Sequence, residues 1–465
     1  MSKAKELQDL LFNKKVNAAE TLSDDEIKTA DDFCEGYKDF LYNCKTEREV
    51  AKWAEETAVK AGFKPFNEFG KPLKAGEKVY VMNRGKAIML CVKGKKPINE
   101  GVRISAAHID SPRVDLKQCP VYEDSSIAYF KTHYYGGIKK YQWAAIPLSL
   151  HGRICKNDGT YVDVRIGEDK GDPKFCITDI LPHLAIEQYQ RKPNELIKGE
   201  EMNILIGSRP FKDDDASEKT KLNILKLLYD KYGVVERDFL SAELELVPAF
   251  TVDDIGFDRS MIGGYGHDDR VCAYPAFEAI LNLDVVPEYT AITVLTDKEE
   301  IGSMGNTGLN SSYMKYFIED LARLEGFEGR DVLRHSKCLS ADVNAAFDPT
   351  WAFAFEKNNA SMLNGGVCVT KFTGARGKSE TSDASAEFVG WVKALLENNG
   401  VVWQSGELGK VDGGGGGTVA MYVANLDVDT IDVGVPVLSM HAPYEVVSKL
   451  DVYMAYKAFK VFFEK

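Results

Sequence analysis

The stretch Ala291–Ser303, AITVLTDKEEIGS, decides the fold that we predict for this chain. Its first five residues are apolar or β-branched, which predicts a short buried strand. The acidic run DKEE follows at the point where that strand should end. In an open α/β sheet the carboxyl ends of the strands meet at one edge, and ligands and catalytic groups gather there. We therefore expect other strand ends of the chain to carry comparable side chains.

Four further segments place histidine or carboxylate side chains at a strand end or a helix start. A strand predicted over Val102–Ala107 ends at the first of these segments, and a helix predicted over Val271–Leu283 begins after the second. The four segments are AAHIDSP with His108 and Asp110, GHDDR with Asp268 and Asp269, LSADVN with Asp342, and LSMHAPYE with His441. Although these clusters lie far apart in sequence, the sheet edge allows them to converge.

The residue types at these positions suit zinc. Imidazole and carboxylate are zinc ligands, and a catalytic zinc keeps one position open for water. Two histidines and three carboxylates divide over two ions as one histidine and one carboxylate each, with one bridging carboxylate. One member of the pair Glu299 and Glu300 can then hold metal while the other faces the water as a base.

Each motif alone has a plainer explanation. A pair of glutamates is usually a solvated face, a histidine at a strand end is usually structural, and acidic residues before a helix usually cap it. The combination is harder to explain in that way, because burying so many carboxylates at one edge without cations would be costly. We therefore predict a metal site around Glu299 and Glu300.

The chain of 465 residues exceeds what one hydrophobic core usually serves, so two domains are expected. Short alternating segments between about residues 115 and 250 predict a β-rich unit, with a polar loop at Ser208–Lys221. Helices and buried strands alternate on both sides of it. The predicted fold class is therefore α/β, with a catalytic domain formed by residues 1–114 and 251–465 and a β-rich domain inserted at residues 115–250.

Charge and composition exclude several function classes. The formal net charge of −13 argues against nucleic acid or an anionic membrane as a partner. No stretch approaches the roughly 18 apolar residues that span a bilayer, and the N-terminal residues lack the pattern of a signal peptide. Nine scattered cysteines indicate neither a disulfide framework nor a thiolate zinc site. A cytoplasmic location is expected.

In their order along the chain, these segments resemble the aspartyl aminopeptidase / vacuolar aminopeptidase I family of zinc aminopeptidases. The resemblance covers nearly the whole sequence, through AAHIDSPR, the YYGG region, LPHLA, GHDDR, DKEEIGS, SADVNAAFDP and SMHAPYE. It implies a discontinuous zinc-peptidase domain, a mixed sheet flanked by helices, and an inserted β-rich, barrel-like dimerisation domain. It also implies two Zn²⁺ per subunit, with Co²⁺ or Mn²⁺ as possible substitutes.

The resemblance also implies a role for each site residue. His108 would bind one metal and His441 the other, with Asp268 as the bridge. Glu300 and Asp342 would complete the two metal sites. Glu299 would be the general base, and Asp110 would orient the His108 imidazole.

Two further residues carry expectations from the same resemblance. His183, in LPHLA, would reach into the active site of a neighbouring subunit, since the family forms dodecamers; the alternative is a packed structural histidine. Lys371, in VTKFTGARG, would face an acidic substrate side chain, although TGARGKSETSDAS departs from the usual pattern. A solvated surface lysine is the alternative there.

The expected activity is hydrolysis of the first peptide bond of peptides that have a free N-terminus, with the preference for the first residue left open. A two-metal deacylase or dipeptidase and a non-catalytic assembly protein are the alternatives. The glycine run at residues 412–418 lacks the order of a phosphate loop. We expect it to allow close backbone approach near the active site or a subunit contact.

Overall fold

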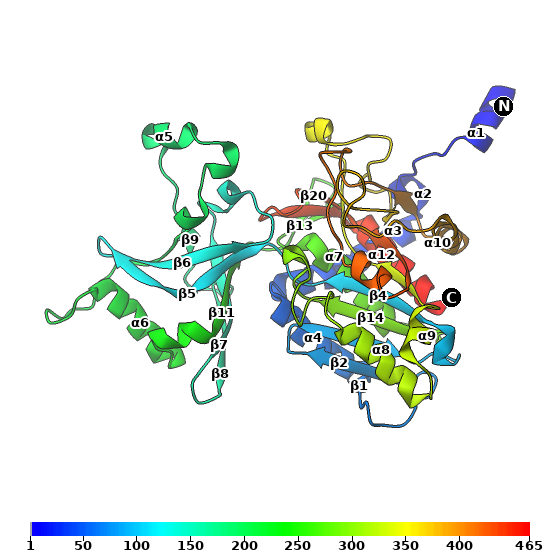
Figure 1. Cartoon of the computed structure of the whole chain (residues 1–465). Coiled ribbons are helices and arrows are strands. Elements are labelled where there is room, and N and C mark those ends of the chain that lie inside the picture. Colours follow the sequence, from blue (N-terminus) through cyan, green and yellow to red (C-terminus); the bar gives the residue numbers. More distant parts are fainter. Residues whose placement is uncertain (1) are drawn as a thin grey trace.

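The computed structural model describes residues 2–465, and its centre is a nine-stranded mixed sheet (Figure 1). The four strands β4, β14, β15 and β19 run parallel, so their carboxyl ends share one edge. The strand order in the sheet is β1 (Lys64–Pro65), β2 (Lys78–Asn83), β3 (Ala87–Val92), β14 (Thr290–Thr296), β4 (Val102–His108), β15 (Lys337–Ser340), β19 (Asp429–Gly434), β17 (Val367–Thr370) and β18 (Trp403–Ser405).

Helices cover both faces of this sheet. Every residue of β3, β4 and β14 is buried, as expected for strands packed on both sides. Side chains alternate along β14, so that Val294 belongs to the core on one face and Leu295 to the core on the other. One face packs against α3 (Asp24–Asn43), α4 (Glu47–Lys60), α7 (His267–Leu281), α10 (Ala386–Asn398) and α12 (Lys449–Glu464); the other packs against α8 (Tyr313–Leu324), α9 (Gly329–Leu333) and α11 (Ala420–Ala424).

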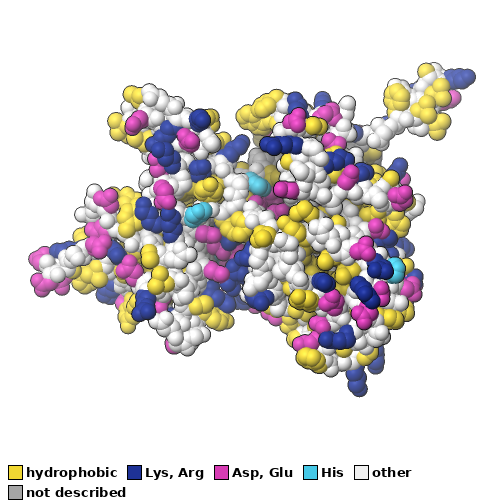
Figure 2. All heavy atoms as spheres, viewed as in Figure 1, with side chains coloured by type: hydrophobic (Ala, Val, Ile, Leu, Met, Phe, Trp, Pro, Cys, Tyr) yellow, Lys and Arg dark blue, Asp and Glu magenta, His cyan; other side chains and the backbone are white. Residues whose placement is uncertain are grey.

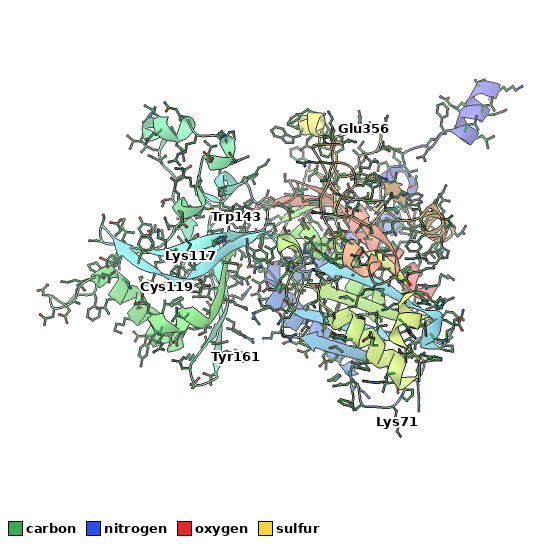
Figure 3. The ribbon with its side chains drawn as sticks, viewed as in Figure 1. Lys71, Lys117, Cys119, Trp143, Tyr161 and Glu356 are labelled. Atoms are coloured by element: carbon green, nitrogen blue, oxygen red, sulfur yellow. The ribbon has the colours of Figure 1, made fainter. Side chains whose placement is uncertain are left out.

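A second, seven-stranded sheet projects from this body as an arm (Figure 1). All its strands lie between Arg113 and Pro248, and it has its own apolar core around Trp143, which Figure 3 labels. Its order is β8 (Tyr161–Ile166), β7 (Leu148–Cys155), β11 (Ala242–Pro248), β5 (Arg113–Asp124), β6 (Ile127–Tyr135), β10 (Ile204–Gly207) and β9 (Cys176–Ile177). An isolated bridge between Leu148 and Phe175 links β7 to the residue before β9, so the sheet curls towards itself.

A third sheet of five strands lies between the arm and α12. Its strands are β12 (Asp253–Ile255), β13 (Met261–Gly264), β21 (Glu445–Ser448), β20 (Pro436–Leu438) and β16 (Asn344–Ala345). Because β21 pairs with β13, this sheet brings the His441 loop beside the start of α7.

The structure confirms a mixed α/β architecture with several sheets and corrects one local prediction. The loop expected over residues 208–221 ends at Lys219, where α6 (Lys219–Tyr232) begins. Leu225, Leu228 and Tyr232 recur at helical spacing and pack against the core of the arm. Most other apolar side chains of α6 are exposed, so its apolar residues are not confined to one stripe and the helix is hard to recognise from sequence. The division of the chain at residues 114/115 and 250/251 stays a prediction.

The remaining elements are short or peripheral. The N-terminal helix α1 (Lys3–Leu11) has no buried residue and extends away from the body, and α2 (Ala18–Thr21) joins it to α3 (Figure 1). α5 (Ile186–Tyr189) lies at the outer end of the arm. Among the described residues 2–465, no helix combines the length and the apolar character needed to cross a membrane.

Candidate metal centre and active site

Two histidines meet on opposite oxygens of one carboxylate. The Nε2 atom of His108 lies 3.1 Å from Oδ1 of Asp268, and Nε2 of His441 lies 3.1 Å from Oδ2. Burial opposes ionisation of Asp268, but hydrogen bonds from the two imidazoles outweigh it and hold its pKa below the usual range. The side chain of Asp268 is only 5% exposed, so its charge is shielded from bulk water.

Local structure explains how these three side chains are presented. His108 is the last residue of β4, at the carboxyl edge of the nine-stranded sheet. Asp268 lies in the first turn of α7 with non-helical φ and ψ of −77° and 109°, which turns it away from the helix axis. His441 follows β20 at a positive φ of 64°, so the chain turns sharply at the imidazole.

Further carboxylates surround His108 and His441, and some of them have an oxygen with no hydrogen-bond partner. Ligand atoms of His108, Asp268 and Glu300 lie within 4.8 Å of one another, as do those of His108, Asp269 and Asp342. Glu300 Oε1 and Asp342 Oδ2 are buried and make no hydrogen bond. Burial raises the pKa of both carboxyl groups well above the ordinary value. Unpartnered buried carboxylate oxygens beside imidazoles fit the donor set that zinc requires.

Asp110 holds the glutamate pair in place. One of its oxygens accepts the backbone N–H of Glu299 at 3.1 Å, and the other accepts that of Glu300 at 3.2 Å. Its backbone carbonyl lies 3.0 Å from Nδ1 of His108, which directs Nε2 towards Asp268. Asp110 therefore contacts both the imidazole and the turn that carries the acids.

The two glutamates point in different directions. Glu300 Oε2 lies 3.6 Å from Nε2 of His441, and its side chain is 3% exposed. Glu299 Oε2 lies 3.8 Å from Nε2 of His108, with a side chain that is 17% exposed. Burial raises the pKa of Glu299 to about 7. A carboxyl group with that pKa can both take and return a proton near neutral pH.

A cavity of about 460 Å³ opens over these residues. Glycines of the run at 412–418 form part of its wall, and a Cβ on Gly415 would lie 2.5 Å from the carbonyl oxygen of Gly374. The run therefore permits close backbone approach at the site, as expected. The cavity is also lined by His108, Asp268, Glu299, Glu300, Asp342, His441, Leu408, Met421, Met440, Tyr422 and Glu380.

Two residues from the sequence prediction lie away from this cavity in the single chain. His183 is exposed on a 3-10 helix, Pro182–Leu184, in the arm. Lys371 is paired with Asp383 and does not line the cavity. The other seven predicted site residues converge at the sheet edge.

The sequence prediction did not assign a role to three residues that contact the site. Buried Glu445 accepts the backbone N–H of His441 at 2.7 Å and that of Asp268 at 3.2 Å. Tyr135 and Gly137, from the arm, hydrogen-bond to Asp110 and His441. Glu445 lies in the motif SMHAPYE, and Tyr135 and Gly137 lie in the motif YYGG. The local sequence does not show which side chains these residues contact.

Histidines and carboxylates that converge at the carboxyl edge of a mixed sheet are the donor set and the position expected of an α/β protein with a metal-dependent active site. Comparison with known families names the group. The model of the M18 family, aminopeptidase I zinc metalloprotease, matches residues 40–463, and the chain belongs to this family of zinc aminopeptidases.

Similar proteins agree with this assignment. The probable M18 family aminopeptidase 1 of Clostridium acetobutylicum is 47% identical over 461 residues, which cover 98% of this chain and 99% of the relative. The crystal structure of an M18 family aminopeptidase from Thermotoga maritima matches with a TM-score of 0.93 at 42% identity, covering 98% of this chain and 100% of that one. The predicted zinc aminopeptidase is thereby confirmed, and its alternatives are not favoured.

Proposed function

We propose that this aminopeptidase binds two zinc ions per subunit, one beside His108 and one beside His441. The observation that carries the proposal is the position of Asp268, which offers one carboxylate oxygen to each side. Asp342 would complete the ligands on the His108 side and Glu300 those on the His441 side. Co²⁺ or Mn²⁺ would suit the same nitrogen and oxygen donors.

When bound, the zinc ions supply a Lewis acid that polarises the scissile carbonyl and lowers the pKa of water. Glu299 Oε2 accepts the proton of the attacking water and delivers it to the departing amine. The turn held by Asp110 keeps the Glu299 carboxylate beside His108 during both transfers. The free N-terminus of the peptide binds within the acidic cavity, which accounts for removal of only the first residue.

We further propose that the first residue removed is neutral or apolar. Leu408, Met421 and Met440 offer an apolar wall to a substrate side chain. Glu380 lines the same cavity, where it would repel an acidic side chain. Recognition of an acidic residue by Lys371 would require its pair with Asp383 to open.

The domain division and the assembly are also proposals. Residues 1–114 and 251–465 would form the catalytic domain, and residues 115–250 the inserted oligomerisation domain. Figure 2 shows apolar side chains at the outer end of the arm, where Ile180, Leu181, Leu184, Ile186 and Tyr189 are 46–69% exposed. Such a patch favours burial against another copy. His183 lies within it, which would allow it to reach a neighbouring active site.

A solved dodecamer of yeast mApe1 supports a homo-oligomer at the level of fold. It is 22% identical, with a TM-score of 0.75, and the match covers 94% of this chain and 97% of that one. Size-exclusion chromatography with light scattering would test the state directly. A cytoplasmic location stays a prediction.

The proposed zinc site is tested by metal analysis together with a substrate panel. The wild type should hold about two zinc ions per chain and hydrolyse aminoacyl anilides, but not N-acylated amino acids. Asp268→Asn should lose at least one ion and most of the activity. A variant that keeps both ions and normal turnover would refute the bridging role.

A further inference from the structure

Three consecutive residues of the arm, Tyr135, Gly136 and Gly137, reach the metal site at the end of β6. We infer that this segment positions both the His441 imidazole and the Glu299–Glu300 turn, so that zinc binding depends on how the seven-stranded sheet docks. The inference rests on the proposed role of His441 as a zinc ligand. The arm would then support zinc binding in addition to its proposed role in oligomerisation.

The first contact orients His441. The Nδ1 atom of His441 donates a hydrogen bond to the backbone carbonyl of Gly137 at 2.8 Å. That bond orients the ring so that Nε2 lies 3.1 Å from Asp268 Oδ2, and it leaves Nε2 as the nitrogen that gives up its proton when zinc binds. Because the His441 side chain is 37% exposed, packing alone does not hold the ring. The Gly137 carbonyl therefore sets the imidazole orientation.

The second contact is a close backbone approach. A Cβ on Gly136, whose φ is 75°, would lie 3.1 Å from Glu300 Oε2 and 3.4 Å from its Cβ. A Cβ on Gly137 would lie 3.3 Å from Nδ1 of His441. The glycines thus let the arm backbone pass directly against two proposed zinc ligands.

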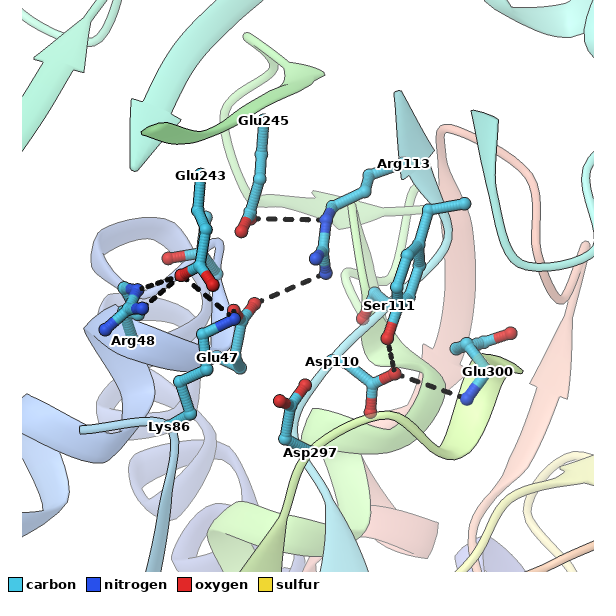
Figure 4. Close-up of polar contacts among 12 residues, drawn as sticks. Glu47, Arg48, Lys86, Asp110, Ser111, Arg113, Glu243, Glu245, Asp297 and Glu300 are labelled. Atoms are coloured by element: carbon cyan, nitrogen blue, oxygen red, sulfur yellow. Dashed lines mark hydrogen bonds and ion pairs between the residues drawn. The ribbon is translucent and has the colours of Figure 1, made fainter. Parts of the chain in front are cut away.

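The third contact reaches the glutamate turn. The Tyr135 hydroxyl donates to Asp110 Oδ2 at 2.8 Å, and the same oxygen accepts the Glu300 N–H. Burial raises the pKa of Tyr135, so its hydroxyl remains a donor throughout the neutral range. Figure 4 shows the bond from Asp110 to the Glu300 backbone beside this contact.

A buried charge network fixes the tyrosine ring itself. The Arg113 guanidinium lies 3.9 Å from the centre of the Tyr135 ring. Arg113 also pairs with Glu47 of α4 at 3.3 Å and with Glu245 of the arm at 3.4 Å (Figure 4). The segment is therefore anchored to both bodies, and a shift of the arm would move it relative to the site.

Two variants test this positioning role with small changes. Tyr135→Phe keeps the ring against Arg113 and removes one hydrogen bond. Gly137→Ala places a methyl group against the His441 ring. The matched controls are Tyr134→Phe, at a neighbouring residue that is 40% exposed, and Gly390→Ala in α10, where a Cβ meets nothing within 4 Å.

Zinc affinity is measured by competition with a chelating dye, and site geometry by the visible absorption of the cobalt-loaded protein. Each test variant should weaken zinc binding about 10- to 100-fold, the range for residues that orient metal ligands. Its cobalt spectrum should change, kcat should fall more than KM rises, and excess zinc should restore much of the loss. The controls should match the wild type within twofold.

Comparison with His441→Ala separates the inference from the proposed zinc site. Loss of zinc in His441→Ala, with both test variants binding zinc as the wild type does, would overturn the inference alone. Full zinc content in His441→Ala would overturn the proposed ligand set and the inference with it. If Gly137→Ala does not fold, Tyr135→Phe decides the question, since it adds no atom.

Discussion

The backbone N–H of Glu299 donates a hydrogen bond to Asp110 across 189 positions of sequence, at 3.1 Å. This bond gives the glutamate pair a fixed direction. It presents the Glu299 carboxylate to the His108 side of the cavity, while Glu300 turns towards His441. The two carboxylates therefore face different histidines although they are adjacent in the chain.

Replacing the proposed base should separate proton transfer from metal binding. Glu299→Gln keeps the shape of the side chain but removes the proton acceptor, so kcat should fall at least about 100-fold with zinc content unchanged. Steady-state kinetics and metal analysis check this. Glu319→Gln, in α8 with a side chain that is 40% exposed, is the control, and near-normal turnover by Glu299→Gln would refute the assignment.

Substrate preference should follow the cavity wall. Leucyl and methionyl anilides should be cleaved at least about tenfold faster than glutamyl anilide, which is the difference in kcat/KM that a few apolar contacts in a pocket produce. Glu380→Gln should narrow that gap by raising kcat/KM for the glutamyl substrate. Lys371→Ala should leave the ranking unchanged. A selective loss of glutamyl activity in Lys371→Ala would instead assign acid recognition to that lysine.

The stability of the protein should depend on Arg113, the cation of the charge network between arm and body. Arg113→Ala leaves Glu47 and Glu245 buried without their shared partner, which should lower the free energy of unfolding by roughly 3–5 kcal/mol. Denaturant titration and limited proteolysis between the two sheets measure this. Lys52→Ala serves as the control, because its pair with Glu56 on the same helix is exposed. Equal stability of the two variants would contradict the prediction.

A second ion-pair contact between the arm and the body, formed by Glu168 and Lys45, predicts how stability depends on pH. Burial disfavours ionisation of Glu168, but hydrogen bonds from His151 and Ser149 and the charge of Lys45 outweigh it and lower its pKa to about 2. Since the folded-state pKa is depressed, this stabilisation is complete above the unfolded pKa near 4.5 and is lost as pH falls towards 2.

Glu168→Gln should therefore destabilise the protein at pH 7, by about 3 kcal/mol at most, and much less at pH 3. Denaturation midpoints at both pH values test this, with Glu68→Gln, at an exposed residue outside the arm, as control. A loss of stability in Glu168→Gln that is the same at pH 3 and pH 7 would rule out this linkage.

Local sequence accounts for much of the fold. The runs at Val102–Ala107 and Ala291–Leu295 predicted strands, and both are buried throughout in the structure; a strand covered on both faces needs no polar alternation. Helix α6 was not predicted, because its apolar residues occur around much of the helix and form no single stripe that marks a buried face. Its place is decided by contact with the arm core rather than by its own pattern.

What the sequence by itself determined is the chemistry available at the sheet edge: which strands end in histidine or carboxylate, and that these groups suit zinc. Only the tertiary structure decided their partners. Tyr135, Gly137 and Glu445 meet the site through contacts between segments far apart in the chain. The physical reason is the separation in sequence over which each kind of interaction acts. Strand and helix patterns arise from neighbouring residues, whereas the orientation of a buried side chain depends on whichever group the packed fold brings to within hydrogen-bonding distance.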